Sequence, residues 1–338
     1  MRLFFRVLLL LCLLAASAVG FALFVPKDTH GFRVAITQGQ GMAAVSRTLA
    51  NNGIVYHRYA VLVSAYLQGA QNKLKTGVYH LPSSVSAWQL VEYLSDAKPE
   101  RSIVQVVEGS TFAQMRRVIN ANPNLRHDTQ DLTDAQLLAK IDEHAISNNP
   151  EGLFFPDSYE TDIGSSDFAV YQLAYKTLQK QLQTVWDDRS PNLPYKNPYE
   201  LLIMASIIEK ETGHPDDRSN VAAVFVNRLH KNMRLQTDPT VIYGMGEAYQ
   251  GNIRKADLQR DTPYNTYTRN GLPPTPIALV GKEALLAATH PSTEEYLYFV
   301  SRMDGSGKSQ FSHHLNEHNT AVRQYILKKT PENKSNKP

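Results

Sequence analysis

The N-terminal segment limits the possible structures of this chain more than any other stretch. MRLFFR carries two arginines and is followed by 19 residues without a charge, VLLLLCLLAASAVGFALFV, which end before Pro26 and Lys27. A run of this length can cross a bilayer as a helix. Positive charge before the run and a long folded region after it predict a cytoplasmic N-terminus and a body outside the inner membrane.

A cleaved signal peptide is the alternative interpretation of this segment, because ASA at residues 16–18 resembles a small-residue cleavage site. Apolar residues continue past that site from Phe21 to Val25, whereas the apolar region of a signal peptide ends before its cleavage site. We therefore expect an uncleaved, single-pass anchor, with the body of the chain outside the inner membrane. Cys12 is the only cysteine, so an intrachain disulfide is impossible.

Length and composition predict a folded protein with more than one domain. The chain has 338 residues, of which 42% are hydrophobic, and this is enough for a sizeable core. Lysine and arginine number 35 against 32 acidic residues, and the formal charge of +3 is too weak to indicate a nucleic-acid partner.

Residues 27–105 show the pattern of a small α+β module. FRVAIT and GVYHL alternate like strands, and GMAAVSRTLANNGIV, HRYAVLVSAYLQGA and SSVSAWQLVEYLSDA have helical spacing. The strand SIVQVVEG and the helix TFAQMRRVINANP follow. The order of strands and helices favours an α+β fold class.

The remainder of the chain is predicted to form a larger mixed domain. Residues 128–197 are polar and irregular apart from one long helix at FAVYQLAYKTLQKQLQTVW, and we interpret GLFFPDSY ahead of it as structural. Residues 198–328 predict the helices YELLIMASIIEKET, RSNVAAVFVNRLHKN, GKEALLAATH and NEHNTAVRQYILKK, and the hairpin YLYFVSRMDGSGKSQFSHH. DGSGKS is expected to be a hairpin turn rather than a phosphate loop, since Arg302 occupies the first glycine position.

The helix LLIMASIIEKET ends on two glutamates with different expected roles. At roughly 100° per residue, Glu211 falls within roughly 40° of the apolar direction, whereas Glu209 points more than roughly 100° away. Glu209 is therefore expected to be a solvated or ion-paired surface residue. Partly apolar surroundings would raise the pKa of Glu211 and suit it to general acid catalysis, although an ion pair with Arg218 or Arg228 is the simpler alternative.

The loops that follow this helix are rich in groups that suit a sugar ligand. NRL, LQTDPTVIYG and YNTYTRNGLPPTPI supply amide, hydroxyl and phenol groups for sugar hydroxyls and aromatic faces for sugar C–H surfaces. The prolines stiffen these loops, which lowers the entropy lost on binding. Self-satisfied, ordered loops remain the alternative.

Several long motifs in this region resemble one known family. ASIIEKET, VFVNRL, LQTDPTVIYGMG, YNTYTRNGLPP and HPSTEEYLYFV are similar to the endolytic murein transglycosylases, bacterial membrane-anchored enzymes that cut peptidoglycan glycan strands. The resemblance is dense from about 199 to 327 and extends through GLFFPDSY to the anchor. It implies a periplasmic orientation, a LysM-like N-terminal subdomain, a catalytic glutamate at Glu211, and interaction with wall-synthesis or division proteins. No cofactor or metal is expected.

The resemblance also implies a mechanism in which one carboxyl acts twice. Glu211 would protonate the oxygen that links MurNAc to GlcNAc, and its carboxylate would then take the proton from the C6 hydroxyl of the same MurNAc, leaving a 1,6-anhydro end. Two alternatives stay open: a muramidase that uses Glu211 with Asp238 to activate water or trap the sugar, and a non-catalytic, membrane-anchored wall-binding scaffold. A metal site in SHHLNEH, with His314 and His318 four residues apart, is less favoured than surface or site-supporting histidines.

The sequence therefore predicts an α+β protein with an N-terminal transmembrane helix, a small LysM-like α+β subdomain and a mixed α+β catalytic domain. The expected parts are a cytoplasmic tail at 1–6, an anchor at 7–25, a LysM-like subdomain at 27–105, a transglycosylase domain at 106–328, and a disordered tail at 329–338. Glu211 is the predicted acid and base. The predicted cleft residues are Asn227, Gln236, Asp238, Tyr243, Tyr264, Asn265 and Tyr267.

Overall fold

The computed structural model describes residues 2–37 and 39–327, so the tail predicted to be disordered lies outside the described residues. The chain divides into two compact units. The N-terminal unit comprises Met1–Ile103, Asn124–Arg126 and Glu160–Ser165, and the C-terminal unit comprises Val104–Pro123, His127–Tyr159 and Ser166–Pro338. The structure confirms an α+β protein with small sheets. The functional assignments of 27–105 and 106–328 stay predictions.

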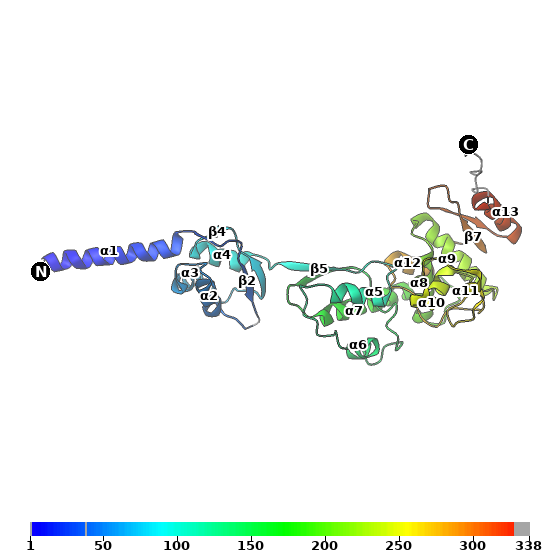
Figure 1. Cartoon of the computed structure of the whole chain (residues 1–338), viewed down its shortest axis with the longest axis horizontal. Coiled ribbons are helices and arrows are strands. Elements are labelled where there is room, and N and C mark those ends of the chain that lie inside the picture. The colour runs from blue at the N-terminus through cyan, green and yellow to red at the C-terminus, as the bar shows by residue number, and fades with distance from the viewer. Residues whose placement is uncertain (1, 38, 328–338) are drawn as a thin grey trace, which may run out of the picture. The chain divides into compact units, whose positions relative to one another are not determined.

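Helix α1 (Arg2–Phe24) covers the apolar segment at the N-terminus (Figure 1). Among the residues that the structure describes, it is the helix whose length and composition would allow it to cross a membrane, and a signal sequence would meet the same criterion. Most of its side chains are exposed, and Leu23 near its C-terminal end is buried in the core of the N-terminal unit.

The N-terminal unit contains the predicted strand, helix, helix, strand, helix order, with two very short strands added. Strand β2 (Arg33–Ile36) pairs antiparallel with β3 (Gly77–His80), and β1 (Lys27–Asp28) pairs antiparallel with β4 (Ser84–Val85). The helices are α2 (Met42–Asn51), α3 (Arg58–Leu67) and α4 (Ala87–Asp96). Their apolar faces and alternate residues of β2 and β3 form one core.

The C-terminal unit is built mainly from helices. They are α5 (Phe112–Asn120), α6 (Asp134–Ile141), α7 (Asp167–Asp187), α8 (Pro198–Glu211), α9 (Pro215–His230), α10 (Asp238–Met245), α11 (Lys255–Gln259), α12 (Lys282–Thr289) and α13 (Leu315–Tyr325). A 3-10 turn, η1 (Gly246–Ala248), follows α10. The short strands β5 (Arg101–Gln105) and β6 (Ser158–Asp162), whose residues are divided between the two units, form a two-stranded sheet. Helices α6, α10 and α11 were not predicted from the sequence.

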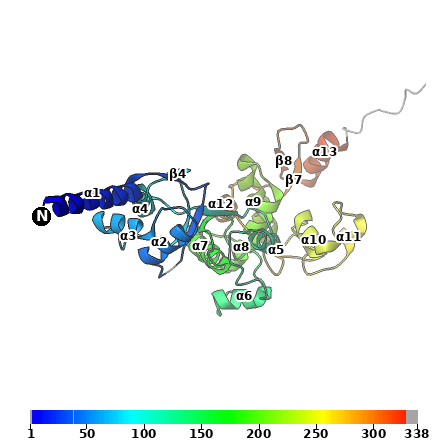
Figure 2. The same ribbon diagram turned by 60° about the vertical axis from the view of Figure 1, so that its left-hand side comes forward.

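Helix α8 is the central element of this unit and packs against α7, α9, α10 and α12 (Figure 2). Leu201–Ile208 are between 0 and 4% exposed, so the helix is buried on every side rather than along one stripe. This corrects the expectation for Glu209. Its carboxylate is half-buried and accepts a hydrogen bond of 3.0 Å from the backbone N–H of Gly281, at the start of α12, where the helix dipole favours an anion.

The predicted hairpin and final helix are present and pack together (Figures 1 and 2). Strand β7 (Tyr298–Ser301) pairs antiparallel with β8 (Ser309–Ser312), and α13 packs against both strands. DGSGKS forms the connection between the strands, as expected, with Gly305 and Gly307 at positive φ. Strand β7 also packs against α9, so the hairpin lies beside that helix.

The segment GLFFPDSY is structural, as predicted. Leu153 and Phe154 are fully buried, and Phe154 stacks on Phe112 of α5 with ring centroids 5.0 Å apart. Gly152 has a φ of +78°, and a Cβ there would lie 2.3 Å from Pro276 Cβ, so only glycine fits.

Candidate active site

Glu211 is placed by the way α8 ends. Asn197 caps the helix at its N-terminus by accepting a hydrogen bond of 3.0 Å from the Glu200 N–H, and Pro198 occupies the first turn. At the other end Thr212 has extended backbone angles, and α9 starts at Pro215. The chain thus turns sharply after Glu211, and the last side chain of a buried helix faces an open cleft.

The cleft has a volume of about 570 Å³ and lies entirely within the C-terminal unit. Its lining comes from the end of α8, from α9, from the start of α10 and the loop after α11, and from the β7–β8–α13 segment. The lining residues are Glu211, Phe225, Arg228, Leu235, Gln236, Asp238, Tyr267, Tyr298, Phe299, Val300, Ser301, Ser309, Leu315, His318 and Asn319. Polar and apolar groups line the cleft around the half-buried carboxyl of Glu211, and such a mixture suits a sugar ligand.

Burial raises the pKa of Glu211 to about 7, because the charged carboxylate loses solvation there. The Thr237 hydroxyl donates a hydrogen bond to Glu211 Oε1 and acts in the opposite direction. The negative charge of Asp238 raises the pKa further, and the positive charge of Arg228 lowers it. The carboxyl can therefore hold or release a proton near neutral pH.

Glu211 takes part in no ion pair among the described residues, so the simpler alternative of a salt bridge to Arg218 or Arg228 is wrong. Arg228 is 8% exposed and donates hydrogen bonds to the backbone oxygens of Leu297 and Leu235, at 2.7 and 2.8 Å, and to the side-chain Oε1 of Gln236 at 3.5 Å. Its guanidinium also lies 5.2 Å from the centre of the Tyr298 ring. Arg228 thus joins opposite walls of the cleft and supplies a positive field without neutralising Glu211.

A cluster of buried threonines holds the donor to Glu211 in place. The Thr237 N–H donates to Thr266 Oγ1 over 3.0 Å, and the Thr240 hydroxyl donates to the Thr237 carbonyl over 2.8 Å. All three threonines are at most 3% exposed. Thr237 is also the N-cap residue of α10, so the start of that helix is fixed against the end of α8.

Three of the predicted cleft residues line the same cleft as Glu211. Gln236 has a left-handed backbone with φ of 51°, and its N–H donates to the Thr266 carbonyl over 3.1 Å. The Tyr267 hydroxyl donates to Asp238 Oδ1 over 2.6 Å. Asp238 is the first residue of α10.

The other four predicted cleft residues lie outside this lining and support it through hydrogen bonds. Asn227 donates to the carbonyl oxygens of Glu294 and Tyr296 over 2.9 and 3.0 Å. The hydroxyl of Tyr264 shares a hydrogen bond of 2.9 Å with Thr275 Oγ1. The polar groups of these side chains are hydrogen-bonded to other protein atoms, as the alternative of ordered, self-satisfied loops predicts.

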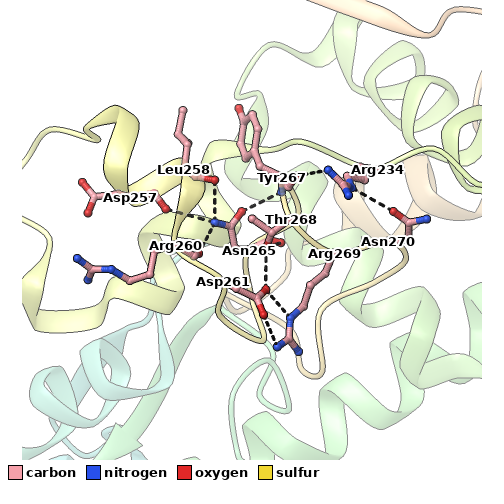
Figure 3. A network of polar contacts seen from close by, with 10 residues as sticks. All are labelled: Arg234, Asp257, Leu258, Arg260, Asp261, Asn265, Tyr267, Thr268, Arg269 and Asn270. Atoms are coloured by element: carbon pink, nitrogen blue, oxygen red, sulfur yellow. Dashed lines mark hydrogen bonds and ion pairs between the residues drawn. The ribbon is translucent and has the colours of Figure 1, made fainter.

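Asn265 has the most complete set of these internal contacts (Figure 3). Its amide donates to the carbonyl oxygens of Asp257, Leu258 and Arg260 at 3.2, 3.1 and 2.7 Å. Its Oδ1 accepts a hydrogen bond of 2.9 Å from the Tyr267 N–H. Asn265 therefore fixes the loop that presents Tyr267 to the cleft.

Tyr243 leads to a second buried carboxyl that sequence reasoning missed. Its hydroxyl donates to Glu151 Oε2 over 3.1 Å, and the Phe112 N–H donates to Glu151 Oε1 over 2.9 Å. Burial raises the pKa of Glu151 to about 7, although these hydrogen bonds lower it in part. Glu151 is 5% exposed and does not line the cleft.

The β7–α13 wall of the cleft was also missed as a site, although HPSTEEYLYFV and SHHLNEH carried its signal. His318 lines the cleft and stacks on Tyr298 with ring centroids 5.3 Å apart. Burial lowers the pKa of His318, which favours the neutral ring. His314 is the N-cap residue of α13, and the described residues contain no group of three or more side chains suited to holding a metal ion.

Comparison with known families places this fold. The model of the YceG-like family matches residues 34–324, which is most of the chain. The chain belongs to the YceG-like family. The crystal structure of a YceG-like protein from Listeria monocytogenes is similar, with a TM-score of 0.56 and 30% sequence identity, covering 86% of this chain and 98% of that one.

Two curated relatives of this chain carry the same functional name. The endolytic murein transglycosylase of Bacillus subtilis is 30% identical over 329 residues, covering 90% of this chain and 88% of the relative. The endolytic murein transglycosylase of Streptococcus pneumoniae serotype 2 is 26% identical over 332 residues, which is 88% of this chain. The alignment spans 58% of the pneumococcal protein.

Proposed function

We propose that the chain is an endolytic murein transglycosylase that cleaves the MurNAc–GlcNAc bond within peptidoglycan glycan strands and leaves 1,6-anhydroMurNAc ends. The observation that carries this proposal is the Glu211 carboxyl, with a pKa raised to about 7, at the edge of a cleft of about 570 Å³. The curated relatives of the same name support the assignment.

In the first step, protonated Glu211 acts as a general acid. It gives its proton to the glycosidic oxygen as the bond to the MurNAc C1 breaks, and positive charge develops on the sugar ring. The Thr237 hydroxyl donates to the carboxylate that results, and the positive charge of Arg228 favours it further. These contacts stabilise the product of proton transfer more than the protonated acid.

In the second step, the carboxylate of Glu211 acts as a general base. It takes the proton from the C6 hydroxyl of the same MurNAc, whose oxygen bonds to C1 and closes the 1,6-anhydro ring. The proton lost in the first step is recovered in the second, so Glu211 is regenerated and no water is consumed. Attack within one sugar is favoured by effective molarity if the ring is held in the required shape.

Gln236, Asp238 and Tyr267 are proposed to bind the glycan, because they line the cleft with Glu211. Tyr267 presents a ring to the C–H surface of a sugar. The exposed side chain of Gln236, whose Oε1 accepts a hydrogen bond of 3.5 Å from Arg228, can donate to a sugar hydroxyl from its amide N–H groups. Asn227, Tyr243, Tyr264 and Asn265 are proposed to act indirectly, by fixing the loops that carry the lining.

We also propose that α1 stays as a single-pass anchor in the inner membrane and that the rest of the chain lies in the periplasm. The two arginines before the span and its continuous apolar length support this orientation. The intact mass of the chain extracted from membranes checks it, because cleavage of a signal sequence at ASA, residues 16–18, would remove the part of α1 that precedes the cut. The LysM-like assignment of residues 27–105 and the interaction with wall-synthesis or division proteins stay predictions.

The decisive experiment is mass analysis of the products from purified glycan strands. Wild type should release fragments that are one water lighter than hydrolysis products, and Glu211→Gln should release them about 10²–10⁴-fold more slowly. Glu209→Gln is the matched control, since it removes a carboxylate from the same helix end while a side-chain oxygen can still accept from the Gly281 N–H. Anhydro ends that appear equally with Glu211→Gln would refute the assignment. Fragments of hydrolysis mass would favour a muramidase, and binding without turnover would favour a scaffold.

A further inference from the structure

Helix α3 carries an exposed apolar stripe on an otherwise well packed unit. Tyr59, Val63, Tyr66 and Leu67 are 58, 41, 73 and 62% exposed. They follow one another at i, i+4, i+7 and i+8, so they share one face of the helix. The opposite face of α3 is buried in the core of the N-terminal unit. Four neighbouring apolar side chains on one helix face mark an interaction surface rather than scattered exposure.

The stripe lies next to the C-terminal end of α1. Helices α1 and α3 pack together, and an apolar cavity of about 260 Å³ lies between them. The residues that line it are Ala18, Val19, Ala22, Leu23, His57, Tyr59, Ala60 and Val63. Two aromatic contacts fasten the same end of α1 to the unit: Phe21 to Tyr56, with centroids 4.8 Å apart, and Phe24 to Trp88, at 5.5 Å.

The depth of α3 in a membrane follows from the part of α1 that it contacts. At 1.5 Å per residue, α1 is about 34 Å long, close to the roughly 30 Å hydrocarbon core of a bilayer. The part of α1 that lines the cavity, from Ala18 onwards, therefore lies within about 9 Å of the end of the span at Phe24. Amphipathic helices that lie in a membrane surface bury their apolar faces by about 5–10 Å. The depth of α3 falls in that range.

We propose that the apolar stripe of α3 inserts into the outer interface of the phospholipid bilayer, beside α1. The N-terminal unit would then be docked on the membrane surface rather than joined to it by a single helix. This inference rests on the proposed role of α1 as an uncleaved anchor.

Two features identify lipid as the occupant of this surface. The stripe is continuous with the lipid-facing side chains of α1 across the cavity that the two helices share. Tyrosine and tryptophan are the residues enriched at membrane interfaces, and Tyr56, Tyr59 and Trp88 gather at this end of the span. Arg58 is the only charged residue of α3, and a cation suits anionic headgroups.

Spin labelling of the full chain in phosphatidylethanolamine and phosphatidylglycerol nanodiscs tests the proposal. Cys12→Ser provides a cysteine-free chain, and single cysteines are then placed by Leu67→Cys, Thr48→Cys and Leu9→Cys. All three positions are exposed on helices, so the labels should not disturb the core. Thr48, on α2, is the water reference, and Leu9, in α1, is the lipid reference. Accessibility to oxygen and to a nickel chelate is measured at each label.

The ratio of oxygen to nickel accessibility at Leu67 should exceed that at Thr48 severalfold and approach that at Leu9. A label at Leu67 that matches Thr48 while Leu9 reports lipid would overturn the docking and leave the anchor intact. A label at Leu9 that reports water would instead overturn the anchor, and the docking with it. Dipolar broadening at Leu67 that requires two chains in one disc would assign the stripe to a second copy, against the proposal.

Discussion

Glu151 and Glu211 share a pKa raised by burial to about 7, yet they lie in different surroundings. Glu151 is 5% exposed, and both of its oxygens accept hydrogen bonds from within the protein, from Phe112 and Tyr243. Glu211 accepts one from Thr237 and lines an open cleft. A raised pKa therefore reports the loss of solvation, whereas chemistry also needs a route to the ligand.

The largest expected effect separates the two carboxyls by activity. Glu211→Gln should lower kcat/KM on glycan strands by about 10²–10⁴-fold, the usual contribution of a general acid and base. Glu151→Gln should keep most of the activity, because its amide can still bond to Phe112 and Tyr243 and it has no access to substrate. Release of anhydro fragments over time measures both. A comparable loss of activity with Glu151→Gln would refute this distinction between the two carboxyls and give Glu151 a role in the reaction.

The next effect concerns stability, where Glu151 should matter. A folded-state pKa of about 7 against 4.5 means that the folded chain binds more protons than the unfolded one between these values. The free energy of unfolding therefore falls as the pH rises from about 4.5 to about 7 and levels off above that. Glu151→Gln removes this loss and should stabilise the C-terminal unit at pH 8 by on the order of 3 kcal/mol.

Urea unfolding of the full chain at pH 8 and at pH 4.5 measures this difference. The gain from Glu151→Gln should fade towards pH 4.5, where the wild-type carboxyl is protonated in the folded state and half protonated in the unfolded state. Glu247→Gln, at an exposed position, is the control and should leave the pH dependence of the wild type unchanged. A variant that is less stable than wild type at pH 8 would mean that the charged form of Glu151 is favoured in the fold.

A smaller effect isolates the hydrogen bond to Glu211. Because the acid must be protonated, kcat/KM should fall above pH 7. The Thr237 hydroxyl lowers the pKa of Glu211, so Thr237→Val should raise it and move this alkaline fall to higher pH by about one unit, the equivalent of one charge-assisted hydrogen bond. Thr237→Ser keeps the hydroxyl and should restore the wild-type profile. A profile that stays in place with Thr237→Val would show that the bond does not tune the acid.

The sequence predicted a carboxyl at the edge of the packed side of the helix at Glu211 because its environment is largely local, whereas its catalytic role was predicted from the resemblance to a known family. It ends a continuous apolar run, so burial of the helix and a carboxyl at its edge both follow from neighbouring residues. Local patterning likewise predicted the hairpin and the helices of the N-terminal unit. It misjudged Glu209, because α8 is buried on all sides and the partner of that carboxylate, Gly281, lies 72 residues further along the chain.

Glu151 and the start of α10 show what local patterns leave out. The two donors to Glu151 are 39 and 92 residues away, and nothing near Pro150 indicates that they converge. Helix α10 did carry a local signal, because Thr237 stands at its N-cap and a proline follows in the first turn. That signal was outweighed by the polar residues around it, which were interpreted as a loop that binds sugar.

The smallest expected effect comes from Asp238 and separates the two possible reactions. Its negative charge raises the pKa of Glu211, so Asp238→Asn should lower that pKa slightly and move the alkaline fall in kcat/KM to lower pH by a few tenths of a unit. The amide oxygen can still accept from the Tyr267 hydroxyl, so the cleft should keep its shape. A hydrolase that needs Asp238 to activate water or trap the sugar would instead lose about 10²–10⁴-fold. A pH–rate profile with mass analysis of the products distinguishes these results. A hydrolase needs a second group to trap the sugar or to activate water, whereas the lyase reaction needs none because the C6 hydroxyl of the sugar is the nucleophile. Near-wild-type release of anhydro fragments by Asp238→Asn would therefore tie the lone Glu211 to the lyase reaction.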